Sequence, residues 1–267
     1  MTAALAITGW LDLAASLALA GGLVFAALVG PPASRGERAL RRALRLLGLV
    51  LPLELGLTAY RLHAVSGAGG RALLVDLLVT RWGMLWAARA AGLAALAARP
   101  RGAAALAALW LAARSFQGHA GAHGTVPALI DWLHLLAAAA WLGGLVQLAL
   151  LPSVTPAVAR RVRTLATGAV GLLVPAGVYG ACLHVPHVHL LVESPYGRAL
   201  LAKLVLAATL VGLGAANHFW HVPALERGDT GSEAALARTV RCELTLAAAV
   251  VGLSALLGVL PMPHGRP

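Results

Sequence analysis

Long apolar runs alternate with short, arginine-rich connections along the whole chain. A membrane-crossing helix needs about 20 mostly apolar residues, and eight runs reach or approach this length. They cover residues 5–29, 42–62, 72–98, 102–118, 127–151, 162–184, 199–221 and 239–260. No run has the apolar–polar alternation that is typical of membrane-spanning strands. The pattern predicts an all-α polytopic membrane protein with eight transmembrane helices.

The composition agrees with a membrane protein. Hydrophobic residues make up 60% of the 267 residues and charged residues 12%, whereas soluble domains carry about 25% charged residues. The segment from Met1 to Trp10 contains no Lys or Arg, which predicts that the first run is a retained helix and not a signal peptide.

Aromatic, glycine and charged residues of the first half return in the same order in the second half. The matching positions are Trp10 and Trp132, Asp12 and His134, Gly21-Gly22 and Gly143-Gly144, Thr80-Arg81-Trp82-Gly83 with Arg89 and Ser194-Pro195-Tyr196-Gly197 with Lys203. Chance similarity explains shared Ala and Leu, but not this order of Trp, Gly-Gly and cation. The repeat predicts two four-helix halves in parallel orientation, residues 1–123 and 124–267.

The net charge of +11 comes mostly from arginines in connections on one side of the predicted bundle. These arginines are Arg35, Arg38, Arg41, Arg42, Arg45, Arg99, Arg101, Arg160, Arg161, Arg163, Arg227, Arg238 and Arg241. By the positive-inside rule this side is cytoplasmic, which puts both termini on the periplasmic side of a bacterial inner membrane. The basic charge then reflects topology and attraction to the lipid bilayer, not binding of nucleic acid.

Most of the ten histidines fall on the opposite, outer side of the predicted bundle. Imidazole is the commonest protein ligand of late first-row transition metals, and Met262 near the last histidine adds a thioether that suits copper. The candidate metal ligands are His119, His123, His134, His184, His187, His189, Met262 and His264. For the group at 184–189, metal binding and a solvated loop are equally compatible with the spacing.

His134 differs from the other candidates because it lies inside an apolar run, three residues after Asp131. Ionisable groups within a membrane span are costly, so they are functional candidates. A carboxylate one turn away can also orient an imidazole. The alternative is that Asp131 caps the helix beside a buried histidine that bonds to a neighbouring helix.

Two further acids, Asp12 and Glu54, lie within predicted spans. They are either members of structural ion pairs or anionic positions on a cation path and around a metal site. Arg61, Arg81 and Arg89 supply enough positive partners to favour the structural role.

Several motifs occur together in one order: Thr80-Arg81-Trp82-Gly83 with Arg89, Gly118-His119-Ala120, Asp131-x-x-His134, Trp141-Leu142-Gly143-Gly144, Ser194-Pro195-Tyr196-Gly197 with Lys203, and Asn217. In this combination the chain resembles the copper-resistance protein D (CopD) family of bacterial inner-membrane proteins. The resemblance covers nearly the whole chain and is strongest from about 115 to 220. It implies copper handling at or across the membrane, with His119 and His134 as copper residues and Asp131 as their orienting partner.

We therefore expect a protein, not an enzyme, that binds copper at its outer mouth. It would transport the ion or deliver it to a partner such as a periplasmic copper-binding protein, and an oligomer is compatible with this role. Only three methionines occur, which argues against a thioether-lined path for Cu(I). The alternative is a b-type haem cytochrome that carries electrons, with His63, His134 and His218 as axial ligands.

Overall fold

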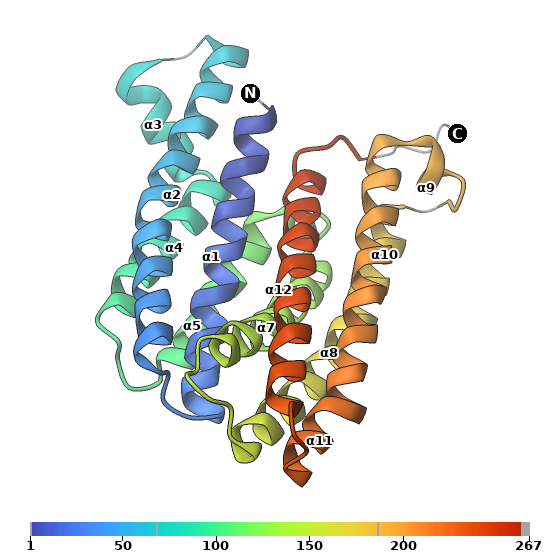
Figure 1. The fold of residues 1–267 in the computed structure, drawn as a ribbon. Coiled ribbons are helices and arrows are strands. Elements are labelled where there is room, and N and C mark those ends of the chain that lie inside the picture. The colour runs from blue at the N-terminus through green and yellow to red at the C-terminus, as the bar shows by residue number, and fades with distance from the viewer. Residues whose placement is uncertain (1, 68, 186, 263–267) are drawn as a thin grey trace.

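The computed structural model describes residues 2–67, 69–185 and 187–262, except for the side chains of residues 74 and 76. Its helices are α1 (Thr2–Leu28), α2 (Ser34–Ser66), α3 (Gly70–Val79), α4 (Arg81–Ala97), α5 (Ala103–Gln117), α6 (His119–Ala122), α7 (Thr125–Ala149), α8 (Pro156–His184), α9 (Leu190–Glu193), α10 (Pro195–Ala216), the π-helix η1 (Asn217–His221), α11 (Val222–Arg227) and α12 (Ser232–Leu257). The described residues contain no strand, so the predicted all-α class is confirmed. The long helices run side by side as one bundle (Figure 1).

Six helical stretches are long and apolar enough to cross a membrane: α1, α2, α7, α8, the continuous stretch Pro195–Arg227 and α12. The bundle also presents apolar side chains outward, since Leu49 is 72% exposed and Val205 59% exposed. Both observations fit a helical membrane protein. The remaining two predicted spans correspond to shorter helices, because α4 has 17 residues and α5 has 15. The count of eight spans stays a prediction.

The prediction of one continuous helix over 72–98 is wrong, because the helix is interrupted at Thr80, between α3 and α4. This residue has an extended backbone, and its hydroxyl accepts a hydrogen bond from the backbone N–H of Gly83 at 3.1 Å, which caps α4. A Cβ on Gly83 would lie 2.2 Å from the carbonyl oxygen of Leu77. Only glycine therefore allows the end of α3 to pack against the start of α4.

The matching motif in the second half has the same local structure. Ser194 caps α10 by accepting a hydrogen bond from the N–H of Gly197 at 2.8 Å. A Cβ on Gly197 would lie 2.0 Å from the carbonyl oxygen of Leu190 in the short helix α9. The shared sequence motif thus encodes one shared turn, in which a short helix folds back on the start of a longer one.

The two Gly-Gly pairs meet where α1 packs against α7. A Cβ on Gly21 would lie 2.6 Å from the Cα of Gly143, and a Cβ on Gly143 would lie 2.3 Å from the Cα of Gly21. Backbone approach this close is possible only between glycines. Equivalent positions of the sequence repeat are therefore in direct contact.

The two repeated tryptophans bond across the bundle in a reciprocal way. The Trp10 indole N–H donates to the Ala248 carbonyl on α12 at 3.2 Å, and the Trp132 indole N–H donates to the Ala108 carbonyl on α5 at 2.7 Å. Each tryptophan thus reaches the last long helix of the other predicted half. This exchange is what a two-fold relation between the halves would produce.

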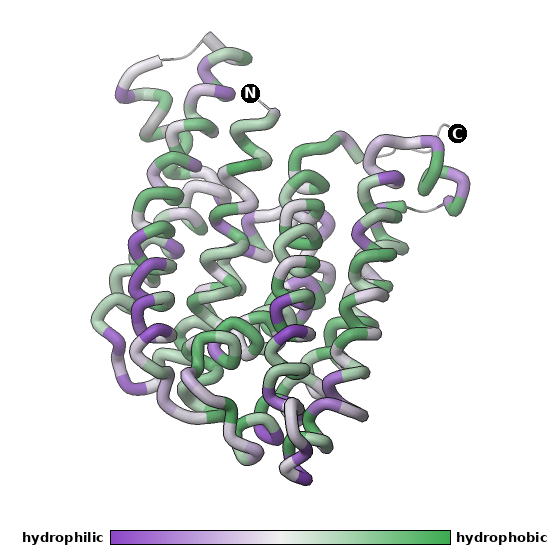
Figure 2. Tube along the Cα trace, viewed as in Figure 1, coloured by the Kyte–Doolittle hydropathy of each residue, from purple (hydrophilic) through white to green (hydrophobic). Residues whose placement is uncertain are grey.

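The two ends of the bundle differ in polarity (Figure 2). The connections α1–α2, α4–α5, α7–α8 and α11–α12 lie at one end, among arginines that include Arg35, Arg99 and Arg161; we call this the arginine-rich end. Helix α1 begins, and α12 ends, at the opposite end (Figure 1). We call that the histidine-rich end, because His187 and His189 lie there in the α8–α9 connection.

Candidate functional site

A cavity of about 670 Å³ opens among α1, α2, α5, α7, α8, α10 and α12, in the part of the bundle nearer the histidine-rich end. We call it the large cavity. Its ionisable and amide-bearing lining residues are Glu54, Arg61, Arg114, Gln117, His119, Asp131, His134, Tyr179, His184, Tyr196 and Lys203. Three predicted metal ligands, His119, His134 and His184, thus share one space although they come from distant segments.

His134 projects from the middle of α7, and its ring is held by the neighbouring helix. Its Nδ1 lies 3.2 Å from the carbonyl oxygen of Leu173 on α8. This bond requires a hydrogen on Nδ1, which leaves Nε2 as the nitrogen with a lone pair. Gly177 makes room for the ring, since a Cβ there would lie 3.3 Å from the His134 Cε1 atom. The ring is therefore oriented for binding through Nε2.

Asp131 lies one turn before His134 on the same helix, and both line the large cavity. Its carboxylate interacts electrostatically with His134, with Arg114 on α5 and with Lys203 on α10. The surroundings of the imidazole thus include one acid and two basic side chains. Of these, only the Asp131 carboxylate would attract a cation bound at His134.

The other candidate histidines make separate contacts. His119 on α6 has its Nε2 2.9 Å from the carbonyl oxygen of Gly258, just beyond α12. The rings of His123 and His184 meet edge to face with centroids 5.4 Å apart. His184 also has its Nδ1 2.7 Å from the Gly180 carbonyl oxygen of its own helix. Each of these imidazoles retains one nitrogen free of backbone contact.

The predicted trio at 184–189 is divided. His184 faces the large cavity, while His187 and His189 are exposed and stack on each other with ring centroids 5.6 Å apart. Met262 packs in an apolar cluster with Tyr196. His264 lies outside the described residues. Within the described ranges, no three His, Cys, Asp or Glu side chains lie close enough to hold a metal ion together.

Asp12 and Glu54 belong to a buried ion network, as the structural interpretation predicts. Arg89 is fully buried, and its guanidinium lies 2.5 Å from the Asp12 carboxylate and 3.1 Å from that of Glu54. Arg114 also pairs with Asp12, and Gln117 accepts from Arg89 at 3.0 Å. These acids therefore orient arginines.

Sequence reasoning did not assign Arg114 and Gln117 to this network. The available signal was Arg114 itself, an ionisable residue inside the apolar run 102–118. Its partner, however, lies on α1, about a hundred residues away, and only the folded bundle brings the two together.

Equivalent positions of the repeat carry different chemistry. Asp12 and Arg89 of the first half form a direct ion pair. Their counterparts are His134 and Lys203, which interact at longer range across the large cavity. In the first predicted half, the charges of Asp12 and Arg89 thus neutralise each other. In the second predicted half, one ring nitrogen of His134 remains available to a ligand.

Three further motif residues, Arg81, Trp82 and Pro195, have structural roles. Arg81 donates to the Gly121 carbonyl at 2.9 Å and so fixes the α5–α7 connection. The Trp82 carbonyl accepts from Gln117 at 3.5 Å. Pro195 is the first residue of α10, a position where its missing N–H costs nothing.

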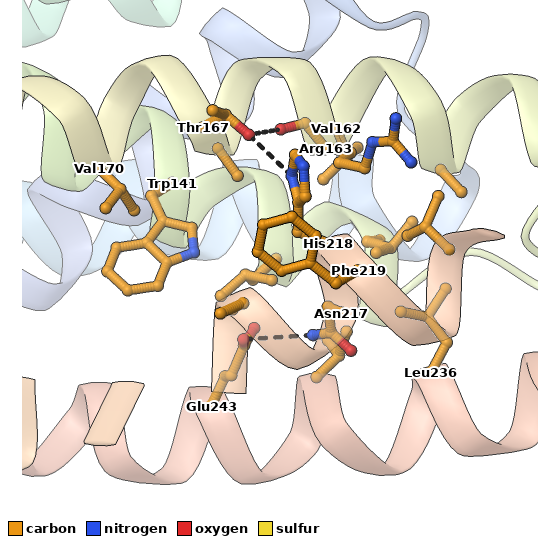
Figure 3. A pocket seen from close by; sticks show the side chains of 18 of the residues that line it. Trp141, Val162, Arg163, Thr167, Val170, Asn217, His218, Phe219, Leu236 and Glu243 are labelled. Atoms are coloured by element: carbon orange, nitrogen blue, oxygen red, sulfur yellow. Dashed lines mark hydrogen bonds between the residues drawn. The ribbon is translucent and has the colours of Figure 1, made fainter. Parts of the chain in front are cut away.

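A second cavity of about 240 Å³ lies nearer the arginine-rich end, lined by residues of α7, α8, α10, η1, α11 and α12 (Figure 3). We call it the small cavity; two motif residues, Trp141 and Asn217, are among those that line it. Its polar residues include Asn217, His218 and Glu243. Trp141 on α7 lines both cavities.

Residues 156–257 match the family model described as Copper resistance protein D. The CopD resemblance is confirmed. Copper resistance protein D of Pseudomonas syringae pv. tomato is 40% identical over 147 residues, which cover 49% of this chain and 47% of that protein. Copper transport protein CutJ of Bacillus subtilis (strain 168) is 34% identical over 164 residues, which cover 57% of this chain and 29% of that protein.

The chain therefore spans about half the length of the first CopD relative and less than a third of the second. No solved structure matches it. Both relatives are named for copper, and neither name supports the haem alternative.

Proposed function

We propose that this protein binds copper in the large cavity and moves it through the membrane. The names of both CopD relatives support copper as the ligand. The observation that carries the proposal is His134, an imidazole within an apolar span whose Nδ1 is held by Leu173 and whose Nε2 is free to bind a metal. Copper is the substrate that enters and leaves this site.

Copper entering the large cavity would meet His134 Nε2 first, with the Asp131 carboxylate compensating its charge. A second nitrogen would come from His119 or His184, which line the same cavity. His119 can turn its ring by giving up its bond to Gly258. Nitrogen and oxygen donors suit Cu(II), or Cu(I) with few ligands, better than a thioether path would.

Transport over simple delivery is supported by a residue that two cavities share. Trp141 is 5% exposed and lines both the large and the small cavity. In this proposal, copper would pass from the large cavity to the small one beside this indole. Delivery to a periplasmic copper-binding protein is the second candidate, supported by the exposed stack of His187 and His189, which a partner could reach directly.

The topology belongs to the same proposal. We place eight spans in two halves, 1–123 and 124–267, with the arginine-rich end in the cytoplasm and both termini in the periplasm of a bacterial inner membrane. The reciprocal bonds of Trp10 and Trp132 and the contact of Gly21 with Gly143 support the two halves. The protein acts as a carrier and not as an enzyme.

Copper uptake into proteoliposomes tests the transport proposal. The wild type should accumulate copper, and His134→Ala should reduce the rate at least about tenfold, which corresponds to about 1.4 kcal/mol. His221→Ala is the matched control, because this histidine lines neither cavity. If the wild type binds copper but never accumulates it, transport is wrong and delivery is favoured.

A further inference from the structure

Glu243 on α12 is a buried acid without a cationic partner. Its side chain is completely buried, and the ion pairs of the described residues do not include it. The Asn217 side-chain amide donates to its Oε1 at 3.2 Å. Its Oε2 is buried with no hydrogen-bond partner, as is Oδ1 of Asn217. Asp12 and Glu54, in contrast, are both neutralised by arginine.

Local helix geometry brings Asn217 and Glu243 together. Asn217 begins the π-helical turn η1 at the end of α10, and such turns occur frequently at functional sites. Gly214 lies just before this turn. A Cβ there would lie 3.6 Å from the Glu243 Oε1 atom and 3.5 Å from the Trp141 ring. Gly214 therefore lies beside both the Glu243 carboxyl group and the ring of Trp141, the residue that lines both cavities.

The small cavity is lined by Glu243 and also by Arg163, which belongs to the N-terminal part of α8, the part nearer the arginine-rich end (Figure 3). Arg163 from α8 and His218 from η1 are the other titratable groups that line it, and α7 adds Trp141, which does not titrate. The His218 Nδ1 atom lies 3.1 Å from the Thr167 hydroxyl. A cavity of this size with several polar groups has room for water, so Glu243 is within reach of a water path.

A buried ionised carboxylate that has one neutral donor and no counter-charge is strongly unfavourable. From this geometry we propose that Glu243 is a proton-binding site. A proton from water at the arginine-rich end forms an O–H bond at Oε2, and the same proton returns to that water when the site empties. No electron transfer is involved. Because Glu243 lines the small cavity together with Trp141, it can exchange its proton when a copper ion moves between the two cavities. This link to copper rests on the proposed function, whereas the proton site does not.

Infrared difference spectroscopy of the reconstituted protein, without copper, tests the site. The wild type at neutral pH should show a protonated-carboxyl C=O band that is absent from Glu243→Gln and disappears as the pH is raised. Glutamine keeps the side chain's shape and its acceptor for Asn217, so the variant should fold. Glu226→Gln, which changes an exposed acid paired with Arg160, should keep the band. Identical wild-type and Glu243→Gln spectra would overturn the proposal.

A bound cation is the competing occupant. In that case Glu243 would give the infrared bands of an ionised carboxylate, and these bands would shift when Na⁺ or Zn²⁺ is added. This result would also overturn the proposed proton site. Coupling is tested separately by copper uptake under an imposed pH gradient. Glu243→Gln should lose the gradient dependence that the wild type and Glu226→Gln retain. If neither the wild type nor the two variants take up copper, the proposed function is wrong. The infrared result still decides whether Glu243 binds a proton.

Discussion

His134 aligns with Asp12 in the predicted sequence repeat, and in the copper proposal this difference decides where the metal binds. The aspartate is neutralised by Arg89 and Arg114 and buried among them. The imidazole is fixed through Nδ1 by a backbone carbonyl and keeps Nε2 for a ligand. The sequence alone predicted both ionisable positions, because each interrupts an apolar run.

The space beside His134 depends on one glycine. Gly177→Ala should push the ring by a few tenths of an ångström, because the added Cβ would lie 3.3 Å from Cε1. We expect copper affinity to fall about tenfold, or about 1.4 kcal/mol, in a titration of purified protein. Gly180→Ala, one turn along on the same helix, meets nothing within 4 Å and should bind copper normally. Equal affinity in the two variants would show that the ring position does not matter.

The ion network of the first half should contribute strongly to stability. Asp12→Asn keeps the side chain's shape but leaves the buried Arg89 with less counter-charge. Breaking a buried ion pair typically costs about 3–5 kcal/mol, so thermal unfolding in detergent should shift markedly downward. Glu226→Gln removes a surface pair with Arg160 and should change the transition little. A wild-type transition for Asp12→Asn would contradict the structural role.

At the scale of helices, the apolar runs predicted most elements, and local capping decided where one prediction failed. The run 72–98 is apolar along most of its length, which suggests a single helix. Thr80, however, caps the start of α4 and so separates α4 from α3. The Thr-x-x-Gly motif at 80–83 and the Ser-x-x-Gly motif at 194–197 were visible in the sequence as a match between the predicted halves. Their meaning as a shared turn required the approach of Leu77 and Leu190 carbonyls to the two glycines.

The crossing of α1 and α7 can be tested at two adjacent glycines. Gly143→Ala would place a methyl group 2.3 Å from the Gly21 backbone, so the helices must separate. We expect a loss of about 1–3 kcal/mol or more, the usual cost of overpacking. Gly144→Ala is the control, since its Cβ would meet only the Val162 side chain at 3.9 Å. The comparison is made by thermal unfolding, and equal transitions would rule out the tight crossing.

At the scale of the whole molecule, the sequence predicted the residues of the candidate site better than their arrangement. His119, His134 and His184 line one cavity, as expected for ligands from distant segments. His187 and His189 are instead exposed at the surface, because the short α8–α9 connection turns them away from His184. The small cavity could not be predicted as a space, since it arises where α7, α8, α12 and the continuous stretch from α10 to α11 pack together.

The haem alternative makes a prediction at this scale as well. A cytochrome would show a Soret band in the visible spectrum of purified protein. The copper proposal predicts no such band after expression in haem-replete cells. Stoichiometric haem in the preparation would favour electron transfer over copper handling.

Copper titration of the purified protein tests the central claim most directly. The wild type should bind about one copper ion tightly, and the double variant His119→Ala/His134→Ala should lose this stoichiometric binding while its helical circular dichroism spectrum is unchanged. His187→Ala/His189→Ala, which changes two exposed rings, provides the matched control and should retain the site. Unchanged affinity in the His119/His134 double variant would contradict the account.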